Sequence, residues 1–371
     1  MKIALVVPGG VDRSGVRNVI PCLLWLIERL TATGDEVHVF ALGQEAEPGT
    51  WSLLGAQVWT AGRRPRRLRT LRDMIAEHRR CRFEVVHAFW AAGPGVVAAV
   101  FGRWTGVPVM LTLPGGDLAA LRGIGYGARL TLRGRLWTRL ALAGATRVVV
   151  QSDWMVERAA PFGVAAVRIP FGVALDRWPV APPRRRAADA PLRLVHVANL
   201  NLVKDQETLL LAMGELRDQG IDFTLDVVGL DTLDGAIQRR CVELGLDDRV
   251  AFRGFHPHAE TRPFVEGADL MVVSSRHEAG PLVALEAAAA GVPTVGTAVG
   301  HVADWAPRAA VAVPVSDAAA LARAIAGLAS DEDERLRLAQ AAQALVLVED
   351  ADVTARLTRE HYMDLLRRVR P

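Results

Sequence analysis

Short apolar segments alternate with helical segments along almost the whole chain, and this alternation leaves few folds open. Continuous apolar runs of four to six residues, separated by helices, are typical of parallel sheets buried on both faces. We expect strands at residues 3–7, 37–41, 85–89, 107–112 and 147–150 in the first half, and at 194–198, 223–228, 250–252, 270–273 and 294–296 in the second. The pattern therefore predicts an α/β protein with a doubly wound parallel sheet in each half.

A proline-rich stretch separates the two halves. Residues 178–191 contain four prolines and show no strand or helix periodicity. We therefore expect a first Rossmann-like domain over residues 1–178, a linker over 179–191 and a second Rossmann-like domain over 192–354. The 371 residues exceed the ~250 to 300 at which a single core stops growing. Two such sheets facing each other would form a cleft beyond the carboxyl ends of their strands, where these sheets bind ligands.

Cysteine usage and hydropathy point to a cytoplasmic protein. Cys22, Cys81 and Cys241 are odd in number and widely spaced, which favours neither a disulfide framework nor a zinc cluster. No apolar run reaches the ~18 residues of a membrane span. The first residues lead straight into an apolar strand and lack the pattern of a secretory signal.

Positive charge is concentrated in the first half of the chain. Residues 1–180 contain 23 lysines and arginines against 13 acidic residues, whereas the remainder contains 21 against 28. Much of the excess lies in residues 63–72 and 78–82. These arginines could contact anionic lipid at the inner membrane face or an acidic acceptor, or they could form a solvated helix face. Nucleic acid is disfavoured, because no groove-reading module or aromatic stacking pattern accompanies them.

Two glutamates eight positions apart, Glu278 and Glu286, stand between two buried strands. The Gly280-Pro281 step between them lets a loop turn into a helix over residues 282–290. The first amides of that helix are unpaired and lie at its positive end, so they attract a diphosphate. One turn further in, the carboxylate of Glu286 can accept hydrogen bonds from two ribose hydroxyls, while Glu278 would face a sugar. The segment indicates a nucleotide-sugar site.

The sequence around these glutamates, residues 274–296, resembles the signature of the family 4 retaining glycosyltransferases, the glycosyl transferases group 1, which have the two-domain GT-B fold. Further matches follow in the expected order at residues 194–205, 226–229 and 244–255, with looser ones at 33–40, 85–90 and 169–176. The resemblance covers nearly the whole chain. It implies a retaining, metal-independent enzyme without a cofactor, which moves a sugar from a nucleotide diphosphate donor to the hydroxyl of a sugar, lipid-linked or small-molecule acceptor.

The resemblance also assigns roles to single residues of the second domain. Lys204 would bind phosphate oxygens, and the leaving diphosphate would itself help to deprotonate the acceptor, so that no conventional nucleophile is required. Glu278 would bind sugar hydroxyls and Glu286 the ribose. The remaining donor-binding positions are Gly229 in the nucleotide pocket and Gly280, Pro281, Leu282 and Val283 along the sugar and the phosphates.

At Asn199 the chain departs from the family pattern. Family members usually carry a second phosphate-binding arginine there, five positions before the lysine. An amide can donate a hydrogen bond to phosphate but brings no charge. Arg253, His277 or an arginine of the first domain could compensate, or diphosphate binding is weaker than in relatives.

Histidines 256 and 258 suggest a metal pair, but no third ligand follows at a useful spacing. The resemblance places them in a loop beside the nucleotide base. We therefore expect no metal site.

Three glycines follow the first strand: Gly9, Gly10 and Gly15. They would let the backbone approach the donor closely, or they form a plain tight turn. Arg13 and Arg17 flank them and could reach donor or acceptor. The spacing is not Gly-x-Gly-x-x-Gly, and strand two does not end in the acidic residue that binds ribose in nicotinamide enzymes. A dehydrogenase is therefore disfavoured.

Asp117 follows another predicted strand beside two glycines. It would bind a hydroxyl or orient the acceptor as a catalytic group, or it would cap the next helix. Family members often carry a histidine at the position of Pro114, where it contacts the donor sugar. His87 could partly replace that histidine, or it could be a satisfied core residue.

Two other functions stay open at this level. A phosphorylase or epimerase could use the same fold, and so could a protein that binds a nucleotide sugar without catalysis. The resemblance further implies that the last helix, residues 355–371, packs back on the first domain. The sugar, the base and the acceptor are not readable from the sequence.

Overall fold

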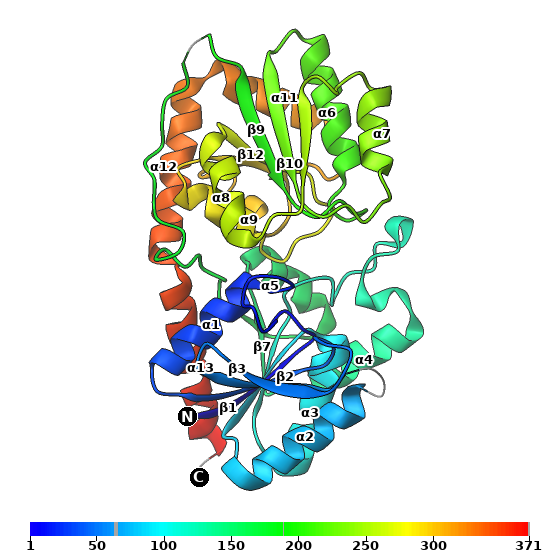
Figure 1. Ribbon diagram of the computed structural model, residues 1–371, viewed down its shortest axis with the longest axis vertical. Coiled ribbons are helices and arrows are strands. Elements are labelled where there is room, and N and C mark those ends of the chain that lie inside the picture. Colours follow the sequence, from blue (N-terminus) through cyan, green and yellow to red (C-terminus); the bar gives the residue numbers. More distant parts are fainter. Residues whose placement is uncertain (63–65, 188, 370–371) are drawn as a thin grey trace. The chain divides into compact units, whose positions relative to one another are not determined.

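The computed structural model describes residues 1–62, 66–187 and 189–369. It divides into two compact units, Met1–Phe171 together with Ala351–Pro371, and Gly172–Asp350 (Figure 1). The chain leaves the first unit at Phe171, seven residues before the expected boundary. Part of the arginine-rich segment, residues 63–65, lies outside the described residues.

Eight strands form the sheet of the first unit. They are β1 (Lys2–Val7), β2 (Glu36–Ala41), β3 (Gly49–Leu53), β4 (Ala56–Thr60), β5 (Val85–Phe89), β6 (Val109–Thr112), β7 (Arg147–Val150) and β8 (Ala166–Arg168). Their order is β3-β4-β2-β1-β5-β6-β7-β8, and neighbours run parallel except in the antiparallel β3–β4 hairpin at one edge. The sequence predicts five of these strands and misses β3, β4 and β8.

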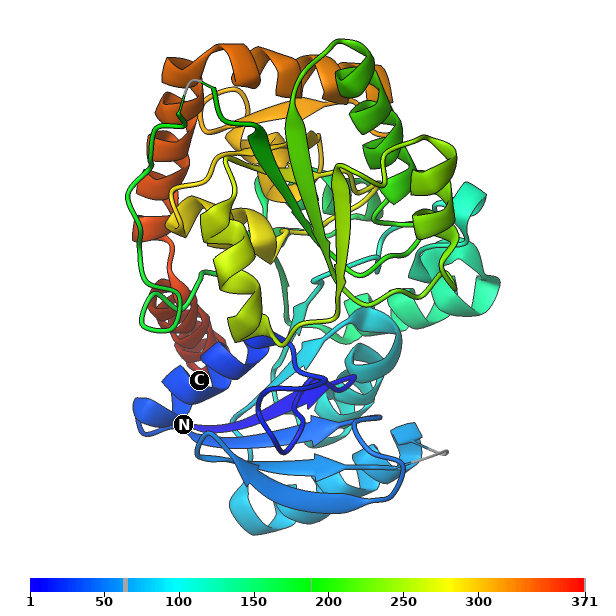
Figure 2. The same cartoon turned by 45° about the horizontal axis from the view of Figure 1, so that its top comes forward.

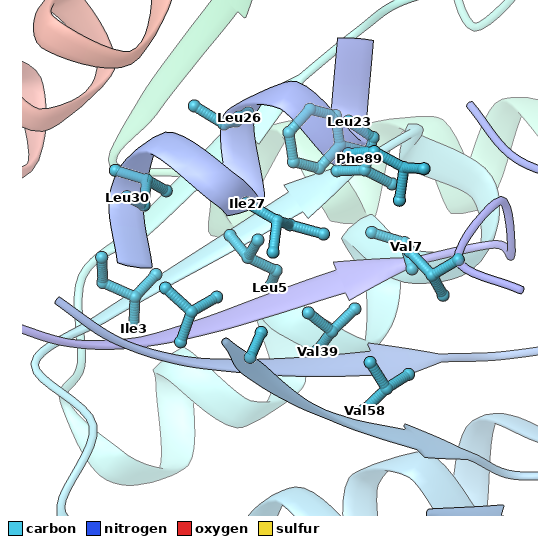
Figure 3. Close-up of a cluster of buried hydrophobic side chains, with 14 of the residues drawn as sticks. Ile3, Leu5, Val7, Leu23, Leu26, Ile27, Leu30, Val39, Val58 and Phe89 are labelled. Atoms are coloured by element: carbon cyan, nitrogen blue, oxygen red, sulfur yellow. The ribbon is translucent and has the colours of Figure 1, made fainter. Parts of the chain in front are cut away.

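Helix α1 (Pro21–Ala32) covers one face of this sheet (Figure 3). Proline at its first position has a backbone angle that suits a helix start. Leu23, Ile27 and Leu30 recur at helical spacing and pack with Ile3 and Leu5 of β1 in one buried cluster. Burying each such side chain stabilises the fold by about 1.5 to 3 kcal/mol.

The other α-helices of the first unit before Phe171 are α2 (Arg66–Cys81), α3 (Val96–Thr105), α4 (Leu132–Gly144) and α5 (Asp153–Ala159). A π-helical turn, Ala91–Gly95, joins β5 to α3. Phe83 lies between Phe40 of β2 and Phe101 of α3, with ring centroids 5.9 and 6.3 Å away. This aromatic cluster ties the helical layer of α2 and α3 to the sheet.

The last helix, α13 (Ala351–Val369), belongs to the first unit and lies beside α1 (Figure 1). Tyr362 and Leu365 are fully buried in the same cluster as α1. Arg359 donates to the buried carboxylate of Asp35, with Nε and Oδ2 2.9 Å apart. The helix begins four residues earlier than the sequence predicts.

A six-stranded, fully parallel sheet forms the second unit. Its strands are β9 (Leu192–Val197), β10 (Phe223–Val228), β11 (Val250–Gly254), β12 (Leu270–Val273), β13 (Thr294–Thr297) and β14 (Ala310–Val313). They are ordered β11-β10-β9-β12-β13-β14. The sequence predicts all of them except β14. The expectation of two doubly wound α/β sheets is confirmed.

Helices cover both faces of the second sheet (Figure 2). They are α6 (Gln206–Asp218), α7 (Ala236–Glu243), α8 (His258–Gly267), α9 (Leu282–Ala289), α10 (Gly300–Trp305), α11 (Ala318–Ser330) and α12 (Glu332–Val348). Helices α6 and α11 share one buried cluster with Leu194, Leu225 and Val272 of the strands. Among the described residues of either unit, no helix is long and apolar enough to cross a membrane.

The proline-rich segment packs on the second unit along part of its length, which corrects the expectation of a linker over 179–191. Trp178 is buried, and its indole Nε1 donates to the carbonyl of Glu286 over 2.9 Å. Ala181 donates its N–H to the carbonyl of Ala289 at 3.0 Å. Arg335 of α12 donates to the carbonyl of Arg184 at 2.6 Å. These contacts satisfy backbone groups that a free linker would leave to water.

Each sheet reverses its strand order at one point. The reversal lies between β1 and β5 in the first unit and between β9 and β12 in the second. In open α/β sheets, ligands bind outside the carboxyl ends of the strands at such a point. The functional site of each unit is therefore sought there.

Candidate active site

The carboxyl ends of β9, β10 and β12 bring together the residues that the sequence predicts for donor binding. Asn199 and Lys204 follow β9, Gly229 follows β10 and Glu278 follows β12. These strands are neighbours in the order β10-β9-β12, although the residues are up to 79 positions apart in the chain.

Lys204 and Glu278 form an ion pair at this edge. Their Nζ and Oε1 atoms are 2.5 Å apart, and both side chains are partly buried. Ser275 donates its hydroxyl to the same oxygen of Glu278 over 2.7 Å. The phosphate-binding cation and the sugar-binding carboxylate predicted from the sequence are thus in direct contact.

Gly229 lets β10 approach β9 closely. Its φ of 157° is rarely adopted by other residues, and a Cβ there would lie 2.0 Å from the carbonyl oxygen of Ala198. Beside it, Asn199 accepts the N–H of Leu230 with its side-chain oxygen at 3.1 Å. The nitrogen of the same amide is the end that could donate to phosphate.

The loop from Glu278 turns into α9 through Gly280 and Pro281. Leu282 and Val283 are the first two residues of this helix, and both are partly exposed. Their N–H groups lie in the first turn, where an α-helix offers no partner within itself. The helix start that the sequence predicts after Gly280 and Pro281 is present, and its contacts with sugar and phosphate stay a prediction.

Glu286 lies inside α9 and is almost completely buried. Its Oε1 atom is 2.5 Å from Nε2 of His258 at the start of α8. The indole of Trp178 packs against His258 at a tilt, with ring centroids 5.2 Å and planes 37° apart. The sequence does not link either residue to Glu286, because they are 28 and 108 positions away from it. The predicted ribose contact of Glu286 stays a prediction.

Arg253, one of the charges proposed to compensate for Asn199, has a carboxylate partner in the second unit, and so does Arg276, which the sequence does not single out. Arg253 donates to Asp226 with Nε and Oδ1 2.6 Å apart. Arg276 forms a bidentate pair with Asp205 at 2.8 and 3.0 Å. Burial raises the pKa of Asp205, but hydrogen bonds, above all from Arg276, outweigh it and hold that pKa below its ordinary value. Lys204 differs from these arginines because its partner is itself a predicted ligand group.

In the first unit, the glycine loop after β1 is folded on itself. Gly10 has a φ of 82°, and a Cβ there would lie 2.4 Å from the side chain of Ile20. Gly15 donates its N–H to the carbonyl of Asp12 at 3.0 Å, while Gly9 lies close to Gln44. These contacts agree with the tight-turn interpretation. The flanking Arg13 pairs with Glu45 at 2.6 Å.

Asp117 lies after β6 and is buried. One carboxylate oxygen accepts the N–H of Ala91 at 2.7 Å, so Asp117 caps the helical segment after β5 and not the next helix along the chain. The other oxygen is buried without a hydrogen-bond partner among the described residues. Burial raises the pKa of Asp117 to about 6, although the N–H of Ala91 opposes the shift.

His87 is a satisfied core residue and does not take the place of the missing histidine. Its Nδ1 is 2.6 Å from the hydroxyl of Tyr362, and its Nε2 is 2.7 Å from Oγ1 of Thr112. Burial lowers the pKa of His87 to about 3, so the ring is neutral at ordinary pH.

Two further features of the first unit are not predicted from the sequence. Gln151, directly after β7, is buried, and neither end of its amide has a partner within the described chain. Glu36, His38 and Cys81 place three potential metal ligands within 4.8 Å of one another. Because Glu36 and His38 lie at the amino end of β2, this cluster is remote from the carboxyl edge where a sugar nucleotide would bind.

Solved structures share this architecture. The sucrose-phosphate synthase of Thermosynechococcus elongatus aligns over 98% of this chain and 99% of its own, with a TM-score of 0.81 and 20% identity. The Anabaena protein Alr3699/HepE, solved with UDP-glucose, aligns over 98% and 99% with a TM-score of 0.75 and 17% identity. Two doubly wound units with loop sites at their carboxyl ends thus define a protein of the GT-B fold.

Family models and curated relatives give the class of reaction. A model of the glycosyl transferases group 1 matches residues 182–345, and one of the glycosyl transferase 4-like domain matches residues 19–172. The glycogen synthase of Mycobacterium tuberculosis is 28% identical over 356 residues, which cover 90% of this chain and 80% of that protein. The D-inositol 3-phosphate glycosyltransferase of Frankia alni is 32% identical over 280 residues, 69% and 66% of the two chains.

The chain belongs to the family 4 glycosyltransferases, the glycosyl transferases group 1. It is an enzyme of glycosyl transfer, and the resemblance read from the sequence is confirmed.

Proposed function

We propose that this glycosyltransferase uses a nucleotide diphosphate sugar, retains the configuration of the transferred sugar and requires no metal. The observation that carries the proposal is the ion pair of Lys204 and Glu278 beside the first turn of α9. A cation next to backbone N–H groups suits a diphosphate, and a carboxylate beside them suits sugar hydroxyls.

In this proposal the bond between the anomeric carbon and the diphosphate oxygen breaks, while the acceptor oxygen bonds to the same face of the sugar. The acceptor proton passes to the leaving diphosphate. Lys204 and the N–H groups of Leu282 and Val283 stabilise the charge that develops there. Glu278 holds sugar hydroxyls, and Glu286, oriented by His258, holds the ribose.

The first test is calorimetric titration of the protein with UDP, GDP and ADP. Lys204→Met removes one charge-assisted contact worth about 1.5 to 3 kcal/mol, so the affinity for the preferred nucleotide falls by about 10- to 150-fold. Lys2→Met is the matched control, because Lys2 and Lys204 are the two lysines of the chain and Lys2 lies at the amino end of β1.

Glu278→Gln separates the proposed role of Lys204 in binding phosphate from the proposed role of Glu278 in holding the sugar. The variant should bind the nucleotide at least as well as the wild type, because Lys204 loses its competing partner, yet transfer should fall. Retention is tested by the anomeric configuration of the product, and metal independence by activity in EDTA. If none of the nucleotides binds at millimolar concentration, the proposal is wrong.

Product analysis tests the other reaction types. Transfer to an acceptor hydroxyl supports the proposal. Sugar phosphate formed from inorganic phosphate would indicate a phosphorylase, and isomerised nucleotide sugar without an acceptor would indicate an epimerase.

We also propose a peripheral contact between the first unit and an anionic membrane. On α4, Leu132, Leu136 and Leu140 recur at four-residue spacing and expose 81%, 53% and 45% of their surface. Exposed Arg139 lies on the same helix. A leucine stripe beside arginines suits the interface of an anionic bilayer. The cytoplasmic location stays a prediction from the sequence.

Sedimentation with lipid vesicles tests this contact. Binding should require phosphatidylglycerol in a phosphatidylcholine bilayer and weaken in Leu132→Ser/Leu136→Ser. Leu347→Ser on α12, an exposed leucine of the second unit, is the control. Equal binding to neutral and anionic vesicles, or none, would contradict the membrane contact.

A further inference from the structure

A pocket of about 840 Å³ lies within the first unit at the carboxyl ends of its central strands. Trp90 after β5 and Asp117 after β6 contribute to its wall, together with Tyr126 from the following loop. The volume falls in the range of ~300 to 1,000 Å³ that is typical of small-molecule sites. The sequence predicts Asp117 here but not the pocket around it.

Three arginines line the pocket: Arg66 and Arg67 from α2 and Arg133 from α4. Among the described residues, none of the three forms an ion pair with a carboxylate. This side of the pocket therefore holds positive charge that no carboxylate pairs with among the described residues.

Arg67 is held in place by protein groups. It donates to the carbonyl of Ala92, and its guanidinium lies 4.8 Å from the ring centroid of Trp137. Burial, followed by the charge of Arg133, lowers the pKa of Arg67. Arg66 and Arg133 have exposed side chains and can turn toward a ligand. An anion in the pocket would relieve the repulsion between these like charges.

Asp117 offers a different chemistry in the same pocket. Its buried second oxygen has no hydrogen-bond partner among the described residues, although such a group costs free energy unless it is satisfied. A ligand hydroxyl would donate to it. The aromatic ring of Tyr126 packs against Gly116 next to it, and aromatic walls of this kind pack against the C–H faces of sugar rings. The pocket therefore combines sites for an anion, a hydroxyl and an apolar ring face.

We propose that this pocket binds the acceptor, and that the acceptor is a polyol or sugar carrying a phosphate or carboxylate group. Arg66 and Arg133 bind the anionic group through their guanidinium N–H donors, and Asp117 accepts a hydrogen bond from a hydroxyl. The inference rests on the proposed function and deepens it, because it names the chemical class of the acceptor.

Calorimetry with three matched probes tests the inference: glucose 6-phosphate, glucuronate and glucose. The preferred nucleotide is present at saturation, so that anions do not bind at the donor site. We expect the charged probes to bind and neutral glucose to bind at least tenfold more weakly, which corresponds to one charge-assisted contact. Comparison of glucose 6-phosphate with glucuronate shows whether the pocket prefers a phosphate or a carboxylate group.

Arginine substitutions test whether the charged probes bind in this pocket. Arg66→Gln and Arg133→Gln should each weaken the charged probe by about tenfold and leave glucose unchanged. Arg79→Gln on α2 and Arg139→Gln on α4 are the controls, because both are exposed arginines of the same helices outside the pocket. Arg67 is left intact because of its structural contacts.

The result that overturns the inference is equal binding of glucose and its charged derivatives, or charged probes that bind the double variant Arg66→Gln/Arg133→Gln as well as the wild type. Binding of none of the charged probes overturns it as well. Nucleotide binding to the second unit is measured separately in the same samples. If the nucleotide binds but the charged probes do not, only the proposed acceptor class is refuted. If the charged probes bind but no nucleotide does, the proposed donor is refuted.

Discussion

Replacing Asp117 by asparagine should make the first unit increasingly stable, relative to the wild type, as the pH rises. The side chain is buried, and burial raises its pKa from 3.8 to about 6. Asparagine has nearly the same shape, and its amide oxygen can still accept the N–H of Ala91. The substitution therefore removes the charge with little change in packing.

The magnitude follows from the two pKa values. A folded pKa of about 6 against 3.8 for the free group corresponds to about 3 kcal/mol at ~1.4 kcal/mol for each pH unit. The pKa of Asp117 is higher in the folded than in the unfolded protein. The stability of the wild type is therefore fully present below pH 3.8, where Asp117 is protonated, and about 3 kcal/mol of it is lost as the pH rises through 6. The stability of Asp117→Asn relative to the wild type should therefore rise by about 2.5 kcal/mol from pH 4 to pH 8, on top of a pH-independent cost of burying the amide NH2 group where Oδ2 has no partner among the described residues.

Urea unfolding of wild type and Asp117→Asn from pH 4 to pH 8, followed by tryptophan fluorescence, measures this difference. Seven of the nine tryptophans lie in the first unit, so the signal mainly reports its unfolding. Asp153→Asn, at an exposed carboxylate of α5, is the control. An equal effect at pH 4 and pH 8, or destabilisation that grows with pH, would refute the reasoning. Transfer activity should fall, since the charged oxygen is proposed to orient the acceptor.

Two other substitutions test contacts that position the sites. Tyr362→Phe leaves one buried nitrogen of His87 without its partner, so the first unit should lose about 1 to 3 kcal/mol of unfolding free energy and α13 should exchange its amide hydrogens faster. Gly229→Ala places a methyl group against the carbonyl of Ala198, so the second unit should melt at a lower temperature and bind nucleotide more weakly. Unchanged melting of the alanine variant would contradict the close approach of β9 and β10.

Buried central strands could be read from the sequence because their apolar runs stand out against the helices around them. The hairpin of β3 and β4 could not, since its strands alternate polar and apolar residues and its turn, Leu54-Gly55, lacks the common Asn-Gly signal. Strand β8 is three residues long and β14 is rich in alanine, so neither resembles a typical strand.

Those parts of the candidate site could be predicted in which the strand order alone brings the residues together. The carboxyl ends of neighbouring parallel strands meet at one edge, which brings Lys204 and Glu278 together from distant motifs. Partners that depend on side-chain packing were not predictable. The contact of His258 with Glu286 and the burial of His87 against Tyr362 depend on three-dimensional distances that no local pattern records.

The position of α13 has a consequence for the order in which the protein is made. The first unit needs the last helix of the chain, because Tyr362 and Leu365 complete its core. The second unit, Gly172–Asp350, is continuous in sequence and is synthesised completely before α13. Domains generally fold in the order in which they are made. Here the second unit can finish first, while the earlier residues wait for the final segment of the chain to cover their exposed apolar surface.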